Sequence, residues 1–488
     1  MRTKNIIITC VAIFMGLWAC NRNELDITDP NVIVATTFFQ NSGELQSAVN
    51  GAYSFLQSQG MYGRIKFFLF DNLGQENAGT DALQGGLGSF IRYTFDASSG
   101  EIFTYWEAVY RGIGSCNFVI ESAEEGLIQN VSQTEINQRL GEARFLRALY
   151  YFYLTNLFGD VPLQTTTSSE SSGAKATQAE IYNLILEDLT FAVANLPTVG
   201  NTPNGRATRG AAQALKGKVH LFLEEWQNAV DEFSAITGYT IEGVAPRDNG
   251  NEAGEFNSES IFEVNYDKQI GGDQWNATGN GLRETTFRGI EYAPTNFANI
   301  IVNPTFLENF EDDDPRIPAY FYRNGDIYNN GELTFENLTA VVWRKYQNLD
   351  VQPQDGFDYS GINFRVIRYA DVLLMWAEAL NELGNQQAAI DLMNQVRDRV
   401  NMPNYGTPEM DSRGFPVNNQ QQVFEAIVHE RAVELAGEQI RILDLKRWGL
   451  AADVLTGFQV GKSERLPIPQ REIDANPDLT NADQNPGY

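Results

Sequence analysis

Apolar residues recur at helical spacing over most of the first half of the chain. In residues 36–59, the apolar positions Leu45, Val49, Ala52, Tyr53 and Leu56 follow helical spacing, which predicts an amphipathic helix with these side chains on its buried face. The same period predicts further helices at about 102–125, within 141–163, at 178–196, and as an antiparallel pair within 205–236 that breaks near Glu225. Residues 34–236 are therefore expected to be mostly helical.

Small and aromatic residues in the last of these pairs follow the spacing of tetratricopeptide repeats. Small side chains let two helices approach closely, and a later aromatic ring fills the gap against the neighbour. The pattern recurs after residue 365, and residues 421–449 supply another helix pair. A divergent helical-repeat array is therefore predicted at about 34–236 and 365–450. The positions in these roles are Ala211, Ala214, Gly217, Leu221, Ala229 and Phe233, then Ala377, Ala379, Gly384, Ala388 and Ala389.

Four consecutive aromatic residues, 150–153, raise the question of a stacking surface for a flat ligand. Within 141–163, however, apolar residues occur at nearly every helical angle, and a helix that is apolar all round is a buried one. The run is therefore predicted to be core packing. Arg144 and Arg147 are the exceptions, and we expect them to pair with carboxylates such as Glu142 or Asp160.

Between about residues 238 and 364 the helical period is weak. Glycine, asparagine and proline are frequent, aromatic residues are scattered, and short strands such as "SIFEVNY" and "TAVVWRKY" interrupt long loops. Residues 60–100 have the same loop-rich character. Long loops in a compact protein are usually functional, and function is commonly carried by loops on a rigid scaffold.

The first twenty residues carry a targeting signal. Arg2 and Lys4 precede an apolar run of about twelve residues, too short to span a bilayer and typical of a signal peptide. The ending "LWAC" resembles the lipobox of bacterial lipoproteins, which implies cleavage before Cys20 and its acylation; an ordinary secretory signal is the alternative. Residues 1–19 are then the signal and 20–33 a lipidated tether. Cys116, on a helical pattern, is expected to pack as a small hydrophobe.

Charge narrows the class of ligand. The net charge is −28, so the surface repels phosphate backbones and nucleic-acid binding is improbable. The same excess of negative charge favours a neutral small ligand over an anionic one, although a local basic pocket would overrule that expectation.

No catalytic apparatus is visible. His429 begins "HERAVE", which lacks the second histidine of a zinc HExxH site, and His220 is likewise expected to be structural or solvent-facing. No GxSxG elbow, P-loop or dinucleotide fingerprint occurs, and the acidic run 312–314 is expected to be a solvated turn. We therefore predict a binding protein with no catalytic residue, cofactor or metal.

Five features together resemble the SusD/RagB family, in that family's order. They are the lipoprotein start, "GEARFLRALYYFYLTNLFGDVPL", "RYADVLLMWAEALNELG", "ERAVELAGEQIRILDLKRWG" and "LPIPQREIDANPDL". The resemblance implies a mainly α fold in which about four tetratricopeptide-like helix pairs support a loop-rich face, as one domain over 34–488. It also implies a surface-exposed, lipid-anchored outer-membrane protein that captures oligo- or polysaccharide for a SusC-like TonB-dependent transporter.

The candidate ligand-binding residues lie on the loops where family members place their site. An exposed ring covers the apolar face of a sugar, while Arg, Asp and Asn side chains bond its hydroxyl rim. Trp275, in "GGDQWNATGNG", is the foremost candidate because no hydrophobic period surrounds it. Trp106 and Trp343 are instead expected in the core. The remaining candidates are Tyr62, Arg64, Asp71, Phe90 and Tyr292.

Two other functions remain open at this point. A glycoside hydrolase needs only two carboxylates, and new reducing ends on incubation with oligosaccharides would reveal it. A helical-repeat adaptor for peptides or proteins would show no glycan affinity but would retain a protein partner.

Overall fold

The structure is a computed structural model that describes residues 35–80, 83, 85–167, 173–270, 284–351 and 360–488. The predicted signal peptide, the tether with Cys20, and Trp275 lie outside these residues. The described part is mostly helical, as predicted, with small two-stranded sheets. Among the described residues, no helix has both the length and the apolar content needed to cross a bilayer.

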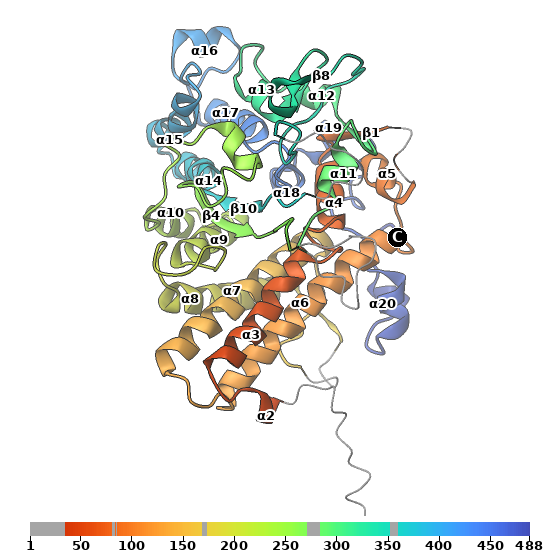
Figure 1. Cartoon of the computed structure of the whole chain (residues 1–488), viewed down its shortest axis with the longest axis vertical. Coiled ribbons are helices and arrows are strands. Elements are labelled where there is room, and N and C mark those ends of the chain that lie inside the picture. The colour runs from red at the N-terminus through yellow and green to blue at the C-terminus, as the bar shows by residue number, and fades with distance from the viewer. Residues whose placement is uncertain (1–34, 81–82, 84, 168–172, 271–283, 352–359) are drawn as a thin grey trace, which may run out of the picture.

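The helices pack in chain order along one side of the molecule, from α3, α6 and α7 at the bottom to α14, α15 and α17 at the top (Figure 1). Each contacts the next, so helix pairs form the predicted repeat-like scaffold. Their bounds are α3 (Ser42–Ser54), α6 (Gly100–Glu124), α7 (Gln133–Phe158), α8 (Gln178–Asn195), α9 (Arg209–Phe222), α10 (Trp226–Ser234), α14 (Tyr369–Glu382), α15 (Gln386–Arg399) and α17 (Gln420–Glu434).

Local sequence explains where these helices begin. A polar side chain at the N-cap accepts a hydrogen bond from a backbone N–H of the first turn, which would otherwise lack a partner. This holds at Asn41, Ser99, Ser132, Thr177, Thr208 and Asn419. Between helices, a Cβ added to Gly217 would lie 2.5 Å from the Phe233 ring. The predicted small-and-aromatic pairing is therefore confirmed at this contact.

The aromatic run 150–153 is buried, as predicted. Its four side chains are at most 8% exposed, and they belong to the main hydrophobic core. Trp106, Trp343 and Cys116 are buried as well. The expected partners of the two arginines were wrong: Arg147 pairs with Asp188 at 2.7 Å, and Arg144 pairs with Glu124 at 2.8 Å. Asp188 lies on α8, so Arg147 fastens α7 to the next helix.

The loop-rich face contains short elements at the upper right of Figure 1. Among the described residues, four antiparallel strand pairs organise it, and β4 with β10 brings the two ends of residues 260–368 together; a fifth pair, β2 with β3, lies between helices α7 and α8. The pairs are β1 (Asn77–Gly79) with β5 (Ile300–Val302), β2 (Val161–Pro162) with β3 (Lys175–Ala176), β4 (Ser260–Val264) with β10 (Phe364–Arg368), β6 (Phe321–Tyr322) with β9 (Val342–Trp343), and β7 (Ile327–Tyr328) with β8 (Leu333–Thr334).

The loop-rich prediction for residues 60–100 was wrong. Helix α4 (Ile65–Leu73) is buried along its whole length, and α5 (Gly85–Arg92) follows it. A helix buried on every side shows no polar stripe, so its period was hidden. The remaining helices are short: α2 (Ala35–Phe38), α11 (Arg288–Tyr292), α12 (Pro304–Leu307), α13 (Arg316–Tyr320), α16 (Pro408–Ser412), α18 (Arg441–Arg447), α19 (Ala451–Val454) and α20 (Gln470–Ala475).

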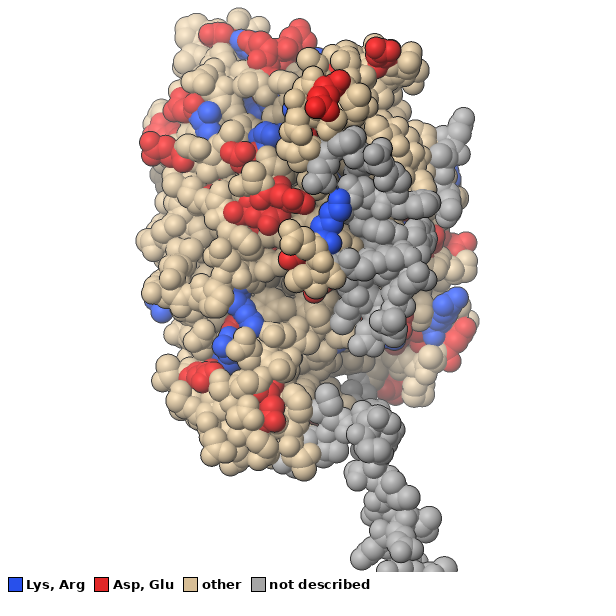
Figure 2. Space-filling model, in the orientation of Figure 1, with Lys and Arg blue, Asp and Glu red and all other residues tan. Residues whose placement is uncertain are grey.

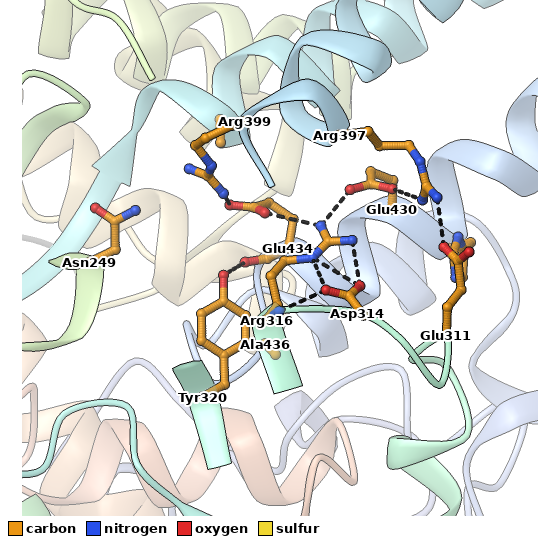
Figure 3. A network of polar contacts seen from close by, with 12 residues as sticks. Asn249, Glu311, Asp314, Arg316, Tyr320, Arg397, Arg399, Glu430, Glu434 and Ala436 are labelled. Atoms are coloured by element: carbon orange, nitrogen blue, oxygen red, sulfur yellow. Dashed lines mark hydrogen bonds and ion pairs between the residues drawn. The ribbon is translucent and has the colours of Figure 1, made fainter. Parts of the chain in front are cut away.

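A buried network of charges fastens the loop-rich face to the C-terminal helices. Arg316 points at Asp314 on one side and at Glu430 and Glu434 of α17 on the other, with all four side chains fully buried (Figure 3). Glu434 also accepts from Arg368 of β10 and Arg399 of α15. The solvated turn expected at 312–314 is thus wrong for Asp314, although Asp312 and Asp313 are exposed.

Candidate functional site

An open pocket of about 330 Å³ lies where the end of α3 meets the chain on either side of residues 271–283. Its lining is mostly polar and mixes amides, one aromatic ring and both signs of charge. It comprises Asn50, Tyr53, Ser54, Leu56, Gln57, Asn204, Gly205, Arg206, Glu263, Val264, Asn265 and Glu284.

Gln57 contacts the described chain on both sides of residues 271–283, which contain Trp275 and are called the Trp275 segment below. Its Nε2 donates to the Asn265 carbonyl oxygen at 2.7 Å and to Glu284 Oε2 at 3.0 Å. The Asp267 amide also donates to the Glu284 carbonyl at 2.8 Å. Trp275, the foremost candidate, lies outside the described residues, but Asn265 before it and Glu284 after it both line the pocket.

Arg206, on the pocket wall, is already paired. Arg206 contacts Glu142 at 2.9 Å, and its guanidinium lies 5.0 Å from the centroid of the Tyr53 ring. The Tyr53 hydroxyl donates to Glu142 at 2.9 Å, while burial raises the pKa of this phenol well above its ordinary value. The Glu142 charge is shared further with Arg139. Arg206 therefore offers hydrogen-bonding groups without an uncompensated positive charge, which suits a neutral polyhydroxylated ligand.

The surface around this face is acidic. Carboxylates are spread over the whole visible side of the molecule, while basic side chains are few (Figure 2). This distribution agrees with the net charge of −28 and with the prediction that nucleic acid is not a ligand.

Arg64 lies close to Phe287, which follows the Trp275 segment in sequence, but it does not line the pocket. Its guanidinium pairs with Glu291 at 2.5 Å and lies 5.2 Å from the Phe287 ring centroid. Phe287 follows the segment closely, and its amide donates to the Gly63 carbonyl at 3.0 Å. The Arg64 side chain is 16% exposed, so it remains a candidate although it is outside the pocket lining.

Four other sequence candidates are in the core, contrary to expectation. Tyr62 and Asp71 are 2% and 1% exposed, and Phe90 and Tyr292 are fully buried. The reason is that Asp71, Phe90 and Tyr292 lie on the helices α4, α5 and α11, and Tyr62 lies in the buried turn before α4. The Tyr62 hydroxyl meets that of Tyr153 at 2.8 Å, and Phe90 packs on Phe95. These four residues were expected to be exposed to a ligand, and their burial contradicts that expectation.

Asp71 and Tyr292 do come together, but inside the protein. The Tyr292 hydroxyl and an Arg288 nitrogen each lie 3.5 Å from Asp71 Oδ2. Burial raises the pKa of Asp71 to about 6, while Arg288 and Lys66 counteract part of that rise. Because both partners are distant for strong hydrogen bonds, desolvation prevails.

We expect Asp71 to make the protein less stable as pH rises. Its folded-state pKa lies above the value of about 3.9 for an unfolded chain, so its contribution is fully present below pH ~4 and is lost as pH rises to about 6. Asp71→Asn should therefore gain thermal stability relative to wild type between pH 4 and pH 7. Melting temperatures at both pH values measure this. An unchanged difference, as expected for the exposed Asp453→Asn, would contradict it.

Two family models match the chain. One, described as "SusD family", matches residues 258–463, and the other, described as "Starch-binding associating with outer membrane", matches residues 26–221. Together they span most of the sequence, one over the N-terminal helices and the other over the loop-rich face and the C-terminal helices. They include α3 and Arg206 on one side of the pocket, and Glu263, Asn265 and Glu284 on the other.

Known relatives resemble the chain over most of its length. A SusD-like protein of Formosa agariphila is 28% identical, with 100% of each chain covered. The starch-binding protein SusD of Bacteroides thetaiotaomicron is 24% identical over 79% of this chain and 78% of its own. The solved structure of a laminarin-binding SusD-like protein is 28% identical, with a TM-score of 0.75 over 92% of this chain and 100% of that one.

Proposed function

The chain belongs to the SusD/RagB family, and from that premise we propose that it captures a glycan at the outer membrane and passes it to a SusC-like TonB-dependent transporter. Capture is by binding, without catalysis. The starch-binding and laminarin-binding relatives support the glycan. The family description that names association with the outer membrane supports the location.

The observation that carries the proposal is the polar pocket lined by Asn265 and Glu284, the described residues on either side of the Trp275 segment. A sugar needs hydrogen-bonding groups for its hydroxyls and a flat apolar surface for its ring face. Asn50, Gln57 and the neutralised Arg206–Glu142 pair supply the first beside the segment. Trp275 is proposed to supply the second, and Arg64 remains a candidate outside the pocket lining.

Attachment to the membrane is proposed to run through Cys20. Two or more acyl chains on one residue are enough for stable anchoring, since each buried methylene contributes about 0.8 kcal/mol. The anchor and the 20–33 tether would hold the binding face outside the cell, where the substrate is met first.

Trp275→Ala should lower glycan affinity at least about tenfold, equivalent to about 1.4 kcal/mol. A stacked indole buries a large apolar area at low conformational cost, so a shallow site loses most of its affinity without it. The measurement is an affinity-gel or calorimetric titration with the polysaccharide selected by a glycan-array screen of the wild type. The melting temperature should stay the same.

A matched variant separates the site from general damage. Trp226→Ala, on helix α10, should leave affinity unchanged. Wild-type affinity in Trp275→Ala removes that residue from the site, and a collapsed melting curve places it in the core. Release of new reducing ends from the bound polysaccharide would contradict the non-enzymatic proposal itself.

A further inference from the structure

A second and larger pocket, of about 460 Å³, lies away from the Trp275 segment. It is formed where the end of α7, the start of α8, the end of α9 and helix α18 meet residues 464–465. Its lining comprises Thr155, Asn156, Gly159, Gln178, Ala179, Tyr182, Phe222, Leu223, Leu443, Lys446, Arg447, Glu464 and Arg465. It shares no lining residue with the loop-side pocket.

Two of its cations lack an ionic partner. Over the described part of the chain, Arg465 forms no ion pair and no side-chain hydrogen bond, and Lys446 Nζ has one partner, the Asn156 carbonyl oxygen at 2.7 Å. Arg447 differs, because Glu378 and Asp444 neutralise it. In a chain with 63 acidic residues and 35 basic ones, unpaired cations gathered in a cavity are unexpected.

The Arg465 side chain packs against the turn at Gly159. Its guanidinium lies against Gly159, where an added Cβ would come within 2.6 Å of Nε. Gly159 has a φ of 76°, a left-handed conformation that side chains disfavour, so both its backbone and its missing side chain suit this approach. The close approach to Gly159 leaves the Arg465 side chain in the lining of the pocket.

The local carboxylate does not cancel these charges. Glu464 accepts from the Gly461 amide at 3.0 Å and makes no ion pair with either cation. Burial lowers the pKa of Lys446 to about 7, Glu464 counteracts this, and Arg465 adds to the lowering. A bound anion would therefore stabilise the protonated form of Lys446.

The rest of the pocket is apolar with a few amides. Phe222, Leu223, Leu443 and Ala179 supply hydrocarbon surface, and Asn156 and Gln178 supply polar atoms. A bare inorganic ion would use only the cations. A small ring with an apolar face and one acidic substituent would use both parts, and a cavity of about 460 Å³ is within the usual range for such ligands.

We propose that this pocket is a second ligand site, specific for a saccharide unit that bears an anionic group, either a carboxylate or a sulfate ester. Arg465 and Lys446 bind the anionic group, and the Phe222 and Leu443 side of the pocket receives the ring. The local basic pocket overrules, at this place, the expectation of a neutral ligand. The inference is independent of the loop-side site, which can bind a neutral glycan whether or not this pocket is filled.

The test is a calorimetric titration of the detergent-solubilised full chain at constant ionic strength. Glucuronate and glucose 6-sulfate serve as probes, and glucose is their neutral match. At least one acidic probe should bind ten or more times more tightly than glucose, and the preference between the two identifies the anionic group. Arg465→Gln should lower this affinity at least tenfold, whereas Arg323→Gln, exposed and outside the pocket, should not.

A second variant, expected to strengthen binding, distinguishes a loss of affinity at the site from a loss caused by misfolding. Glu464→Gln removes the one carboxylate in the lining and should strengthen acidic-probe binding. Affinity should also weaken from pH 6 to pH 8.5, because burial lowers the pKa of Lys446 to about 7 and its proton is lost over this range. The other charged groups in the lining are Arg447, Arg465 and Glu464, and Tyr182, its pKa raised by burial, stays neutral. Equal binding of glucose and both acids, no binding at all, or indifference to Arg465→Gln and Glu464→Gln would each overturn the proposal. A neutral glycan still retained through Trp275 would leave the proposed function standing.

Discussion

Arg316→Met should lower the free energy of unfolding by about 3–5 kcal/mol, because it removes a positive charge shared by three buried carboxylates. Arg316 contacts Asp314 at 2.8 Å, Glu430 at 2.5 Å and Glu434 at 3.1 Å, and none of the four side chains is exposed. Methionine fills most of the volume, so the loss reports the charge and not a cavity. Chemical denaturation at neutral pH measures it.

A surface pair provides the comparison for this variant. Arg111 contacts Glu107 at 2.7 Å, with 51% and 43% of their side chains exposed. Arg111→Met should cost at most about 0.5 kcal/mol, because exposed helix pairs contribute little. If Arg316→Met cost no more than this, the buried network would not hold the loop-rich face to the C-terminal helices.

This network also explains the charged residues in a motif that the sequence assigned only to a helix pair and to the family resemblance. In "ERAVELAGEQIRILDLKRWG" charged residues stand among apolar ones at helical spacing, which is ambiguous between a solvated face and an ion-paired interior. The structure places Glu430, Arg431 and Glu434 inside, bonded to residues 60 or more positions away in sequence. A one-dimensional pattern contains no record of such partners. The same holds for Arg147, whose partner Asp188 lies on the next helix and not nearby in the chain.

The scaffold was predictable where helices have one buried and one exposed face. Helix α8 was predicted at 178–196 and spans Gln178–Asn195. Helix α4 was missed because all of its side chains are buried, so "IKFFLFDNL" shows no alternation of apolar and polar faces. The error then spread to the site, since Asp71 was treated as a loop residue when it belongs to this helix.

The candidate site was predictable only in part. Trp275 was singled out by the absence of a hydrophobic period around it, and the described residues on either side of its segment do line a polar pocket. Tyr53, Gln57 and Arg206 were missed. Tyr53 follows the apolar stripe of α3 and was assigned to its buried face, while Arg206 reaches the pocket from more than 150 positions further along. Their common feature is spatial, and no spacing rule reveals it.

Phe152→Ala should lower the free energy of unfolding by about 3–5 kcal/mol, because the ring is 1% exposed and its loss leaves a cavity in the main core. The ring packs edge-on against Phe222 of α9, with centroids 5.0 Å apart, and against Tyr153 at 5.9 Å. Neighbouring helices α7 and α9 are both fixed by the rest of the scaffold, so they can close little of the space. The measurement is chemical denaturation of the variant beside wild type.

Binding measured in parallel decides between the two interpretations of the aromatic run. If the four rings are scaffold, Phe152→Ala at a temperature where it is folded should bind the selected polysaccharide with wild-type affinity. Phe103→Ala, on α6 and only half-buried, should cost clearly less stability because solvent already reaches part of that ring. A variant with unchanged stability and lost affinity would make residues 150–153 a ligand surface. The burial of all four rings argues against that outcome, since a ring without exposed area has no face to offer a sugar.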